Sequence, residues 1–223
     1  MNFAIKVSDL AFNWPQNKTF SLSIPDWQVT AGQNVFLYGP SGSGKSTFLN
    51  LLSGVVAGYS GQLSVLGQDL KALSAAKRDR FRAKHIGMIF QQFNLLPYLS
   101  GWQNIELGRY FAPQRDQKNN DLLTELTDKL QLSDTLLKQR SGSISVGQQQ
   151  RIAVARALIN QPQLIIADEP TSALDSELRD QFIELLLSTS SDSTVIFVSH
   201  DKSLARHFDV QFDLMQLRGA KHK

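Results

Sequence analysis

Nine residues near the start of the chain, "GPSGSGKST" from Gly39 to Thr47, have the composition and order of a loop that binds phosphate. They fit the pattern G-x-x-x-x-G-K-[ST] in full, between an apolar run that predicts a strand and a segment that predicts a helix. Glycines let the backbone curl until successive N–H groups face phosphate oxygens, and the helix start adds positive potential. We therefore predict a nucleotide site. The alternative is a glycine- and serine-rich turn that matches the pattern by coincidence.

Four side chains could act on a bound phosphate. Lys45 can bring its charge to the β- and γ-phosphates, and Ser46 can offer a hydroxyl to Mg²⁺. In "LIIADEP", Asp168 and Glu169 end an apolar strand, and open parallel sheets bind ligands at the carboxyl ends of their strands. We expect Asp168 to hold Mg²⁺ through its water shell and Glu169 to act as general base on the attacking water. The alternative is that Asp-Glu-Pro only caps the next helix.

A histidine ends another apolar run, "VIFVSH", at His200. An imidazole at a strand tip could bind the γ-phosphate or orient the attacking water. A lone histidine in this position is more often an ordinary polar strand end. Its order after the phosphate loop and the acidic pair favours the functional interpretation.

The elements that must position these residues follow from the apolar pattern. "NVFLY", "HIGMIF", "QLIIAD" and "TVIFVSH" are continuous apolar runs separated by helical segments, which predicts a buried parallel sheet. The alternation in "FAIKV" and "TFSLSI" predicts an antiparallel sheet at the start. Between Gln92 and Asn160 the pattern becomes helical, with Leu122, Leu126 and Leu130 on one face.

Composition limits the function classes. The chain has 223 residues, 42% of them hydrophobic and 19% charged, as in an ordinary globular chain. It has no cysteine, which excludes disulfides and thiolate metal sites, and no apolar run long enough to span a membrane. The net charge of +3 is too small to indicate nucleic acid. Five Lys or Arg in the eight residues from Lys77 fit a solvated helix better than a nucleic-acid patch, because no aromatic residues alternate with them.

Taken in order, these motifs resemble those of the ATP-binding-cassette (ABC) ATPases over about residues 1–219. "ISVGQQQRIAVARAL" is similar to the signature loop and its helix, and "SALD", Ser172 to Asp175, to the D-loop. Gln91 matches the Q-loop glutamine. Trp14 takes the place of the aromatic residue that stacks on adenine, with Phe12 as the less favoured candidate.

The resemblance implies an α/β fold: a P-loop NTPase core of mostly parallel sheet, with an antiparallel β subdomain and a helical subdomain. It implies one domain over residues 1–223, in which 1–91 and 161–223 form the core and flap and 92–160 the helical subdomain. The family pairs two subunits head to tail around ATP and Mg²⁺, so a partner cassette, identical or different, is expected. Catalysis is expected from Lys45, Gln91, Glu169 and His200, and Mg²⁺ binding from Ser46, Gln91 and Asp168.

The resemblance also assigns nucleotide contacts. Ser145, Gly147 and Gln148 would face the γ-phosphate bound by the partner subunit. The full set of expected nucleotide-binding residues is Trp14, Gly39, Pro40, Ser41, Gly42, Ser43, Gly44, Lys45, Ser46, Thr47, Gln91, Ser145, Gly147, Gln148 and Asp168.

The wider sequence resembles the branch of lipoprotein-release, macrolide-efflux and cell-division ATPases, which work with a separate membrane permease. The expected function is therefore ATP hydrolysis that drives such a permease, at the cytoplasmic face of the membrane and without nucleic acid. Two other functions stay open: a soluble single-cassette ATPase of an assembly process, and a nucleotide-sensing regulator with little turnover.

One residue departs from the family pattern inside the signature loop. Val146 stands where the family usually has glycine, and Ser141 where it often has proline. If φ at Val146 is negative, a β-branched residue is tolerated there; if φ must be positive, valine is strained. We expect a negative φ and an active site.

Overall fold

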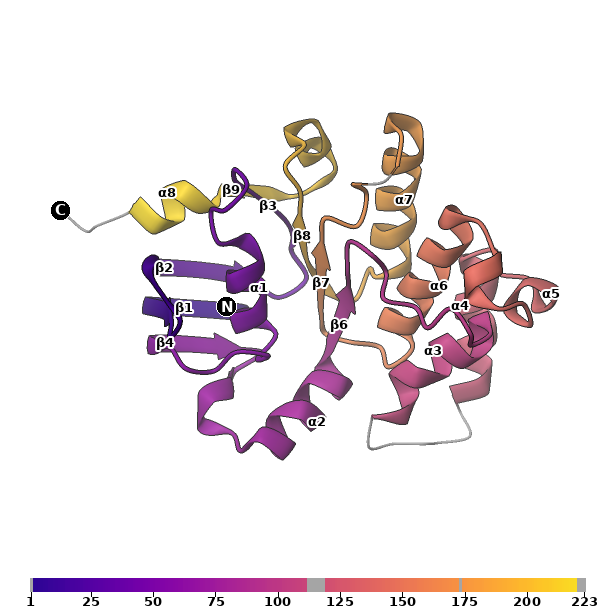
Figure 1. Ribbon diagram of the computed structural model, residues 1–223, viewed down its shortest axis with the longest axis horizontal. Helices are drawn as coiled ribbons and strands as arrows, with labels where there is room; N and C mark the ends of the chain where they lie inside the picture. The colour runs from indigo at the N-terminus through magenta and orange to yellow at the C-terminus, as the bar shows by residue number, and fades with distance from the viewer. Residues whose placement is uncertain (1, 112–118, 173, 220–223) are drawn as a thin grey trace.

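The computed structural model describes residues 2–111, 119–172 and 174–219. A five-stranded parallel sheet lies at its centre, in the strand order β6-β7-β8-β3-β9 (Figure 1). Its strands are β3 (Asn34–Tyr38), β6 (Ile86–Ile89), β7 (Leu164–Asp168), β8 (Thr194–Val198) and β9 (Val210–Asp213). The predicted α/β architecture with a buried parallel sheet is confirmed.

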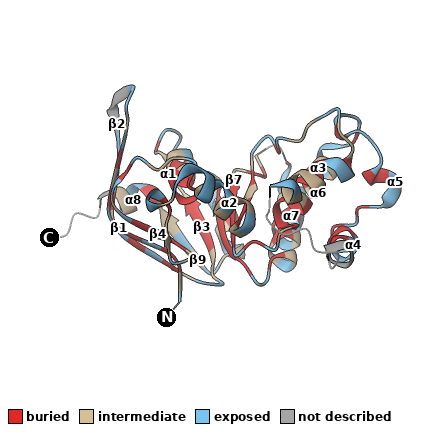
Figure 2. Ribbon diagram, turned by 90° about the horizontal axis from the view of Figure 1, so that it is seen from below, coloured by how far each residue is buried: buried red, intermediate tan, exposed pale blue. Residues whose placement is uncertain are grey.

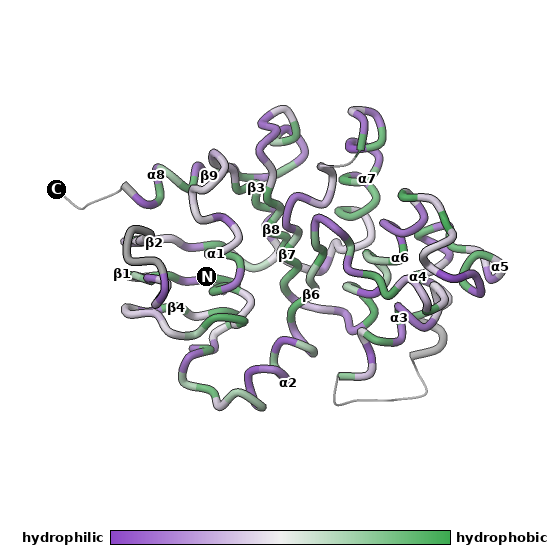
Figure 3. The backbone as a smooth tube through the Cα atoms, in the orientation of Figure 1, coloured by the Kyte–Doolittle hydropathy of each residue, from purple (hydrophilic) through white to green (hydrophobic). Residues whose placement is uncertain are grey.

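The central strands consist mostly of apolar residues, as expected for a sheet with both faces covered. In β7, Ile165 belongs to one hydrophobic cluster and Leu164 to the other, and Val195 and Ile196 divide in the same way in β8. The buried strands appear in Figure 2, and in Figure 3 as a hydrophobic band through β6, β7 and β8. A strand buried on both faces loses the polar alternation that a half-exposed strand keeps.

A second, antiparallel sheet has the order β2-β1-β4-β5. Its strands are β1 (Phe3–Trp14), β2 (Asn17–Thr30), β4 (Ser60–Val65) and β5 (Gln68–Asp69). Helix α1 (Lys45–Leu52) lies between the two sheets, and its Phe48 and Leu51 are fully buried in the cluster that joins them (Figure 1). The start of α1 is thereby fixed against both sheets.

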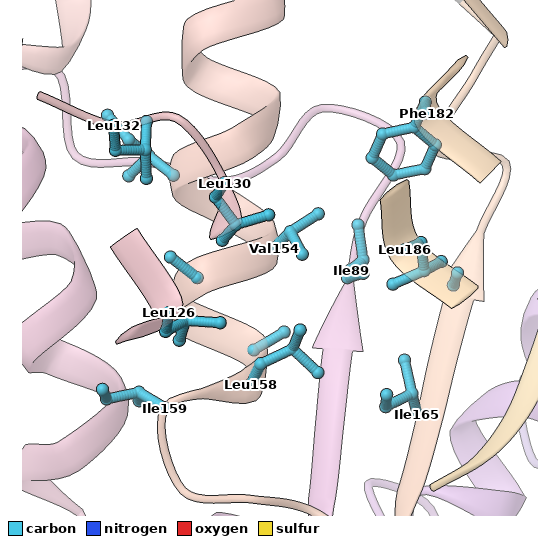
Figure 4. Packing of buried hydrophobic residues seen from close by; sticks show 14 of the residues in the cluster. Ile89, Leu126, Leu130, Leu132, Val154, Leu158, Ile159, Ile165, Phe182 and Leu186 are labelled. Atoms are coloured by element: carbon cyan, nitrogen blue, oxygen red, sulfur yellow. The ribbon is translucent and has the colours of Figure 1, made fainter. Parts of the chain in front are cut away.

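Five helices of the described chain lie on the other side of the parallel sheet. They are α3 (Gly101–Tyr110), α4 (Asn119–Lys129), α5 (Asp134–Leu137), α6 (Val146–Leu158) and α7 (Ser176–Thr189). Helices α6 and α7 lie next to the strands of the sheet, and α3, α4 and α5 lie farther out (Figure 1). Figure 4 shows Leu126 and Leu130 pointing toward α6 and its Val154 and Leu158, with Ile89 of β6 beyond them. The predicted apolar stripe is buried at Leu126 and Leu130, while the side chain of Leu122 is outside the described part.

The remaining helices lie at the edges. They are α2 (Ala75–His85), α8 (Leu214–Gly219) and three 3-10 turns, Leu70–Ala72, Ser141–Ser143 and Lys202–His207. None of the residues of α2 is buried, as expected for the solvated helix predicted from Lys77 onward. Within the described residues, every helix is too short or too polar to cross a membrane. The division at residues 92–160 stays a prediction, although α3 to α6 all fall inside that range.

Replacing Leu130 by alanine should lower the free energy of unfolding by about 2–5 kcal/mol, because a fully buried leucine leaves a cavity among α4, α6 and β6. Urea unfolding followed by circular dichroism measures the change. Leu178→Ala is the matched control, since Leu178 is 45% exposed on α7 and should shift stability little. Equal losses in the two variants would contradict this packing.

Candidate nucleotide site

The candidate site residues follow three neighbouring strands at one edge of the parallel sheet. Strands β7, β8 and β3 pair in parallel, with Asp168 opposite Val198 and Val198 opposite Leu37. The residues that follow these strands are the acidic pair, His200 and the phosphate loop. Parallel strands end together, so side chains far apart in sequence meet here.

The phosphate loop has the backbone that an anion cradle requires. Gly42 and Gly44 have φ of 75° and 99°, and Gly44 is the N-cap of α1. The buried Ser43 Oγ has no hydrogen-bond partner among the described residues. A buried polar atom without a partner is costly, and a phosphate oxygen in the loop would supply one. Ser43 and the two glycines therefore fit a bound phosphate.

The Lys45 ammonium is almost fully buried at the base of this loop. It donates to the carbonyl oxygens of Gly39 at 2.8 Å and Pro40 at 3.1 Å. Its Nζ lies 3.6 Å from Glu169 Oε1. Two of its three N–H groups thus hold the loop, and the third faces the catalytic edge.

Asp168 and Ser46 form the candidate metal position. The Asp168 carboxylate accepts a hydrogen bond from Ser46, and burial raises the pKa of Asp168 above its usual value. Within the described chain, no three His, Cys, Asp or Glu side chains gather as a metal site. One hydroxyl and one carboxylate are instead the donor set that suits Mg²⁺ shared with phosphate oxygens, since Mg²⁺ keeps few protein ligands.

Glu169 turns away from the strand with an unusual backbone. Its φ is 46°, in the left-handed region, while its N–H still donates to the Val198 carbonyl at 2.9 Å. Glu169 Oε2 lies 3.1 Å from His200 Nδ1. In the tautomer that suits a carboxylate partner, Nδ1–H donates to Glu169 and Nε2 is left as an acceptor for water. The turn thus places Glu169 between Lys45 and His200.

The aromatic side chain of Trp14 contacts the phosphate loop. Its indole N–H donates to Thr47 Oγ1 at 3.2 Å, which ties the ring to the first turn of α1. Phe12 meets Trp14 edge to face but is itself buried in the core. Phe12 therefore has no face to offer a base, and Trp14 stays the predicted stacking residue.

Gln91 follows β6 beside β7 and is exposed. Two residues further on, Phe93 and Asn94 both have left-handed backbones, with φ of 56° and 50°. Their carbonyl oxygens accept hydrogen bonds from the Arg156 guanidinium of α6. This partly buried arginine, whose pKa is lowered by desolvation, fixes the chain after Gln91 to the signature helix. Sequence reasoning missed it, because a left-handed pair without glycine gives no local signal.

The signature segment forms an ordinary helix start. Ser145 is the N-cap of α6, and Gln148 and Ser145 exchange side-chain to backbone hydrogen bonds in a capping box. Val146 is the first helical residue, is 49% exposed and is not among the described residues with positive φ. The expected negative φ is confirmed, and valine carries no left-handed strain.

The chain does not bring this segment to its own phosphate loop. Helix α6 belongs to the helical side of the molecule and α1 to the opposite side, with β6, β7 and β8 between them (Figure 1). Gly39 to Thr47, Asp168, Glu169 and His200 meet within one chain, whereas Ser145, Gly147 and Gln148 do not join them. Ala173 of the predicted D-loop lies outside the described residues.

Arg218 was not predicted either, although it contacts the phosphate loop. Its guanidinium, at the end of the chain on α8, donates to the Ser43 carbonyl at 2.7 Å and to the Ser21 carbonyl of β2. The Ser43 carbonyl belongs to the peptide that leads into left-handed Gly44. Arg218 thus holds the loop against the antiparallel sheet, and only the folded chain places it there.

Replacing Arg218 by methionine should weaken binding of a fluorescent ATP analogue about fivefold, because a charge-assisted hydrogen bond to the loop is lost. Fluorescence titration measures the affinity, and thermal unfolding checks the fold. Arg80→Met on exposed α2 makes the same charge change away from the loop. An affinity equal in both variants would exclude this role for Arg218.

Comparison with known proteins also indicates an ATP-binding protein. The family described as ABC transporter matches residues 22–172. The uncharacterized ABC transporter ATP-binding protein YbbA of Escherichia coli (strain K12) is 38% identical over 183 residues, which are 81% of this chain and 80% of YbbA. The macrolide export ATP-binding/permease protein MacB of Pasteurella multocida (strain Pm70) is 35% identical over 82% of this chain, but this chain spans only 28% of MacB.

Solved structures agree with the fold. The dimeric ATP-binding cassette MJ0796 bound to ADP and Pi superposes with a TM-score of 0.79 and 30% identity, covering 94% of this chain and 93% of MJ0796. The cbiO1 protein of Clostridium perfringens has a TM-score of 0.83 at 22% identity, which supports the fold alone. Since the family match covers more than half of the chain and YbbA is similar over four fifths of it, this protein belongs to the ABC transporter family, among its ATP-binding cassettes.

Proposed function

We propose that this cassette hydrolyses ATP and thereby drives a separate membrane permease. One observation carries the proposal: Glu169 lies 3.6 Å from the Lys45 ammonium and 3.1 Å from the His200 imidazole, at the open end of the parallel sheet. A base, a cation and a proton carrier thus stand beside a phosphate cradle.

The residues divide the work of hydrolysis. The loop N–H groups and Lys45 bind and orient the phosphates, and Glu169 takes the proton of the attacking water. His200 holds Glu169 through Nδ1–H and offers Nε2 as an acceptor to the attacking water. Ser46, Asp168 and Gln91 would hold Mg²⁺, which when bound neutralises charge on the phosphate oxygens.

We propose a dimer as the active form. Ser145, Gly147 and Gln148 are separated from the phosphate loop of their own chain, so they can complete a site only in another subunit. The MJ0796 structure is described as dimeric, which supports the same arrangement here. The second cassette is an identical or a related chain.

The permease contact is proposed at a groove beside the Gln91 segment. The groove has a volume of about 550 Å³ and is more apolar than polar; Met88, Phe90, Asn94, Leu107 and Phe111 are among its lining residues. Because Arg156 also lines it and holds Phe93 and Asn94, a helix bound there would act directly on the Q-loop. We accordingly propose that the cassette lies at the cytoplasmic face of the membrane, bound to the permease.

The transported substrate is proposed only as a class. MacB is a macrolide export ATP-binding/permease protein, and the sequence also resembles ATPases of lipoprotein release. We propose export or release of a lipoprotein, peptide or drug. The alternative, a soluble ATPase of an assembly process, predicts no membrane partner.

Glu169→Gln should keep ATP binding, abolish turnover and trap an ATP-dependent dimer, because the amide retains the shape of the side chain but cannot accept the proton. Gel filtration with light scattering, with and without ATP, measures the mass. Lys45→Ala added to Glu169→Gln is the control and should remain monomeric, since it lacks the charge that binds the phosphates. A monomer in Glu169→Gln with ATP would contradict the dimer mechanism.

Phe111→Ala should reduce the permease recovered with the tagged cassette from detergent extracts about fivefold, as expected for removal of an exposed aromatic anchor. Phe111 is 67% exposed and lines the groove. Met215→Ala is the control, because Met215 is exposed on α8, away from the groove. Mass spectrometry quantifies the partner. Failure of the wild-type chain to recover any membrane protein would favour the soluble alternative.

A further inference from the structure

Arg179 joins the two loops on either side of Glu169. It lies in the first turn of α7, directly after the predicted D-loop. Its Nε donates to the Leu174 carbonyl at 2.8 Å, and its Nη1 donates to Asp201 Oδ2 at 2.9 Å. A single planar guanidinium therefore holds the loop after β7 to the loop after β8.

Asp201 is a firmly held acceptor next to His200. Its Oδ1 accepts from the Ser203 N–H at 3.0 Å and from Ser203 Oγ at 2.7 Å, and its own N–H donates to Ser199 Oγ at 3.1 Å. The Ser203 hydroxyl first, and Arg179 further, hold the pKa of Asp201 below its usual value. The two neighbours of His200, Ser199 and Asp201, are thus hydrogen-bonded to each other, and this bond holds the backbone of His200 between them.

These contacts close a ring around the general base. His200 Nδ1 faces Glu169 Oε2 at 3.1 Å, and the Glu169 carbonyl accepts from the Ser172 N–H at 3.2 Å. From Glu169 the chain leads to Leu174, where Arg179 binds and returns to Asp201. If Arg179 releases the loop after β7 or the loop after β8, that loop no longer fixes the orientation of His200 relative to Glu169.

The pair contributes geometry more than stability. Arg179 and Asp201 have side chains 29% and 30% exposed, and a half-exposed ion pair stabilises a fold little. The fork of arginine donors, however, can bind a carbonyl and a carboxylate in one plane, whereas the single nitrogen of lysine cannot hold the same arrangement. Such a contact specifies position.

We propose that Arg179 is a positioning residue for hydrolysis, which is anchored on the Leu174 carbonyl and acts through Asp201 to hold His200 in line with Glu169. The inference rests on the proposed ATP hydrolysis. Among the described contacts, Arg179 reaches none of the phosphate-loop residues Gly39–Thr47. Its effect must therefore reach the reaction through His200.

The chain offers a matched control in the same pair of elements. Arg206, in the turn Lys202–His207, donates to Asp180 Oδ2 of α7 at 2.6 Å, and His207 Nε2 lies 2.8 Å from the other Asp180 oxygen. Arg206 joins α7 to this turn as Arg179 does. Among the described contacts it reaches neither the D-loop nor His200.

The experiment compares Arg179→Met, Arg179→Lys and Arg206→Met by ATP turnover, affinity for a fluorescent ATP analogue and thermal unfolding. Arg179→Met should lower kcat about tenfold, with KM and affinity within about twofold of wild type. Arg179→Lys should keep most of that defect, and Arg206→Met should retain wild-type kcat. The inference is overturned if Arg179→Met keeps kcat, or if Arg206→Met loses as much.

A double-mutant cycle tests the route through His200. In the His200→Ala background, Arg179→Met should change kcat less than twofold, because the residue it positions is gone. Effects that multiply would show an independent action of Arg179 and overturn the proposal.

A readout without turnover separates this inference from the proposed function. NMR signals of the His200 and His207 imidazoles are assigned by their loss in His200→Ala and His207→Ala. Arg179→Met should move the His200 signal and leave His207, and Arg206→Met should do the reverse. An unmoved His200 signal overturns the inference even if the wild-type chain hydrolyses no ATP, whereas a moved signal without hydrolysis contradicts only the proposed function.

Discussion

The hydrogen-bonded ladder of β7, β8 and β3 is the constraint on which the site depends. Each strand is buried on both faces. A shift of the pairing register by one residue would therefore move every side chain from the hydrophobic cluster on one face to the cluster on the other. The ladder continues past the end of β7, where the Glu169 N–H bonds the Val198 carbonyl. A left-handed glutamate costs about 1–2 kcal/mol, and the two buried faces of the sheet offset that cost. The position of the base therefore follows from the packing beneath it.

Three arginines on helices hold the loops that this edge carries. Arg156 bonds the carbonyls of Phe93 and Asn94, Arg179 that of Leu174, and Arg218 that of Ser43. Each bond fixes a loop through its backbone and leaves the side chains of the loop available for nucleotide. Helices α6 and α7 lie on the same side of the parallel sheet, and α8 lies beside the antiparallel sheet (Figure 1). Movement of one of these helices can therefore be transmitted to a loop of the site through the planar guanidinium of its arginine.

The sequence sufficed for whatever depends on local pattern. Continuous apolar runs predicted the parallel strands, the phosphate loop predicted the start of α1, and strand ends predicted where Asp168 and His200 lie. It did not suffice for the left-handed Glu169 or for Arg218, whose partner Ser43 is 175 positions away. Such contacts depend on how elements pack, and neither residue type nor spacing records them. The negative φ at Val146 is an intermediate case: the sequence left it open, but it follows from the capping box formed by its neighbours Ser145 and Gln148.

Gly147 supports the proposal that the signature segment completes a site in another subunit. A β-carbon added to Gly147 would meet no atom within 4 Å, and the residue lacks the positive φ that favours glycine. At Gly108, by contrast, a β-carbon would lie 2.5 Å from the Arg156 carbonyl, so packing of α3 against α6 explains that glycine. Glycine inside a helix costs about 1 kcal/mol relative to alanine. Nothing within the described chain offsets this cost at Gly147, and a close approach by a phosphate on a partner cassette would. Val146 beside it is half-exposed at the first helical position.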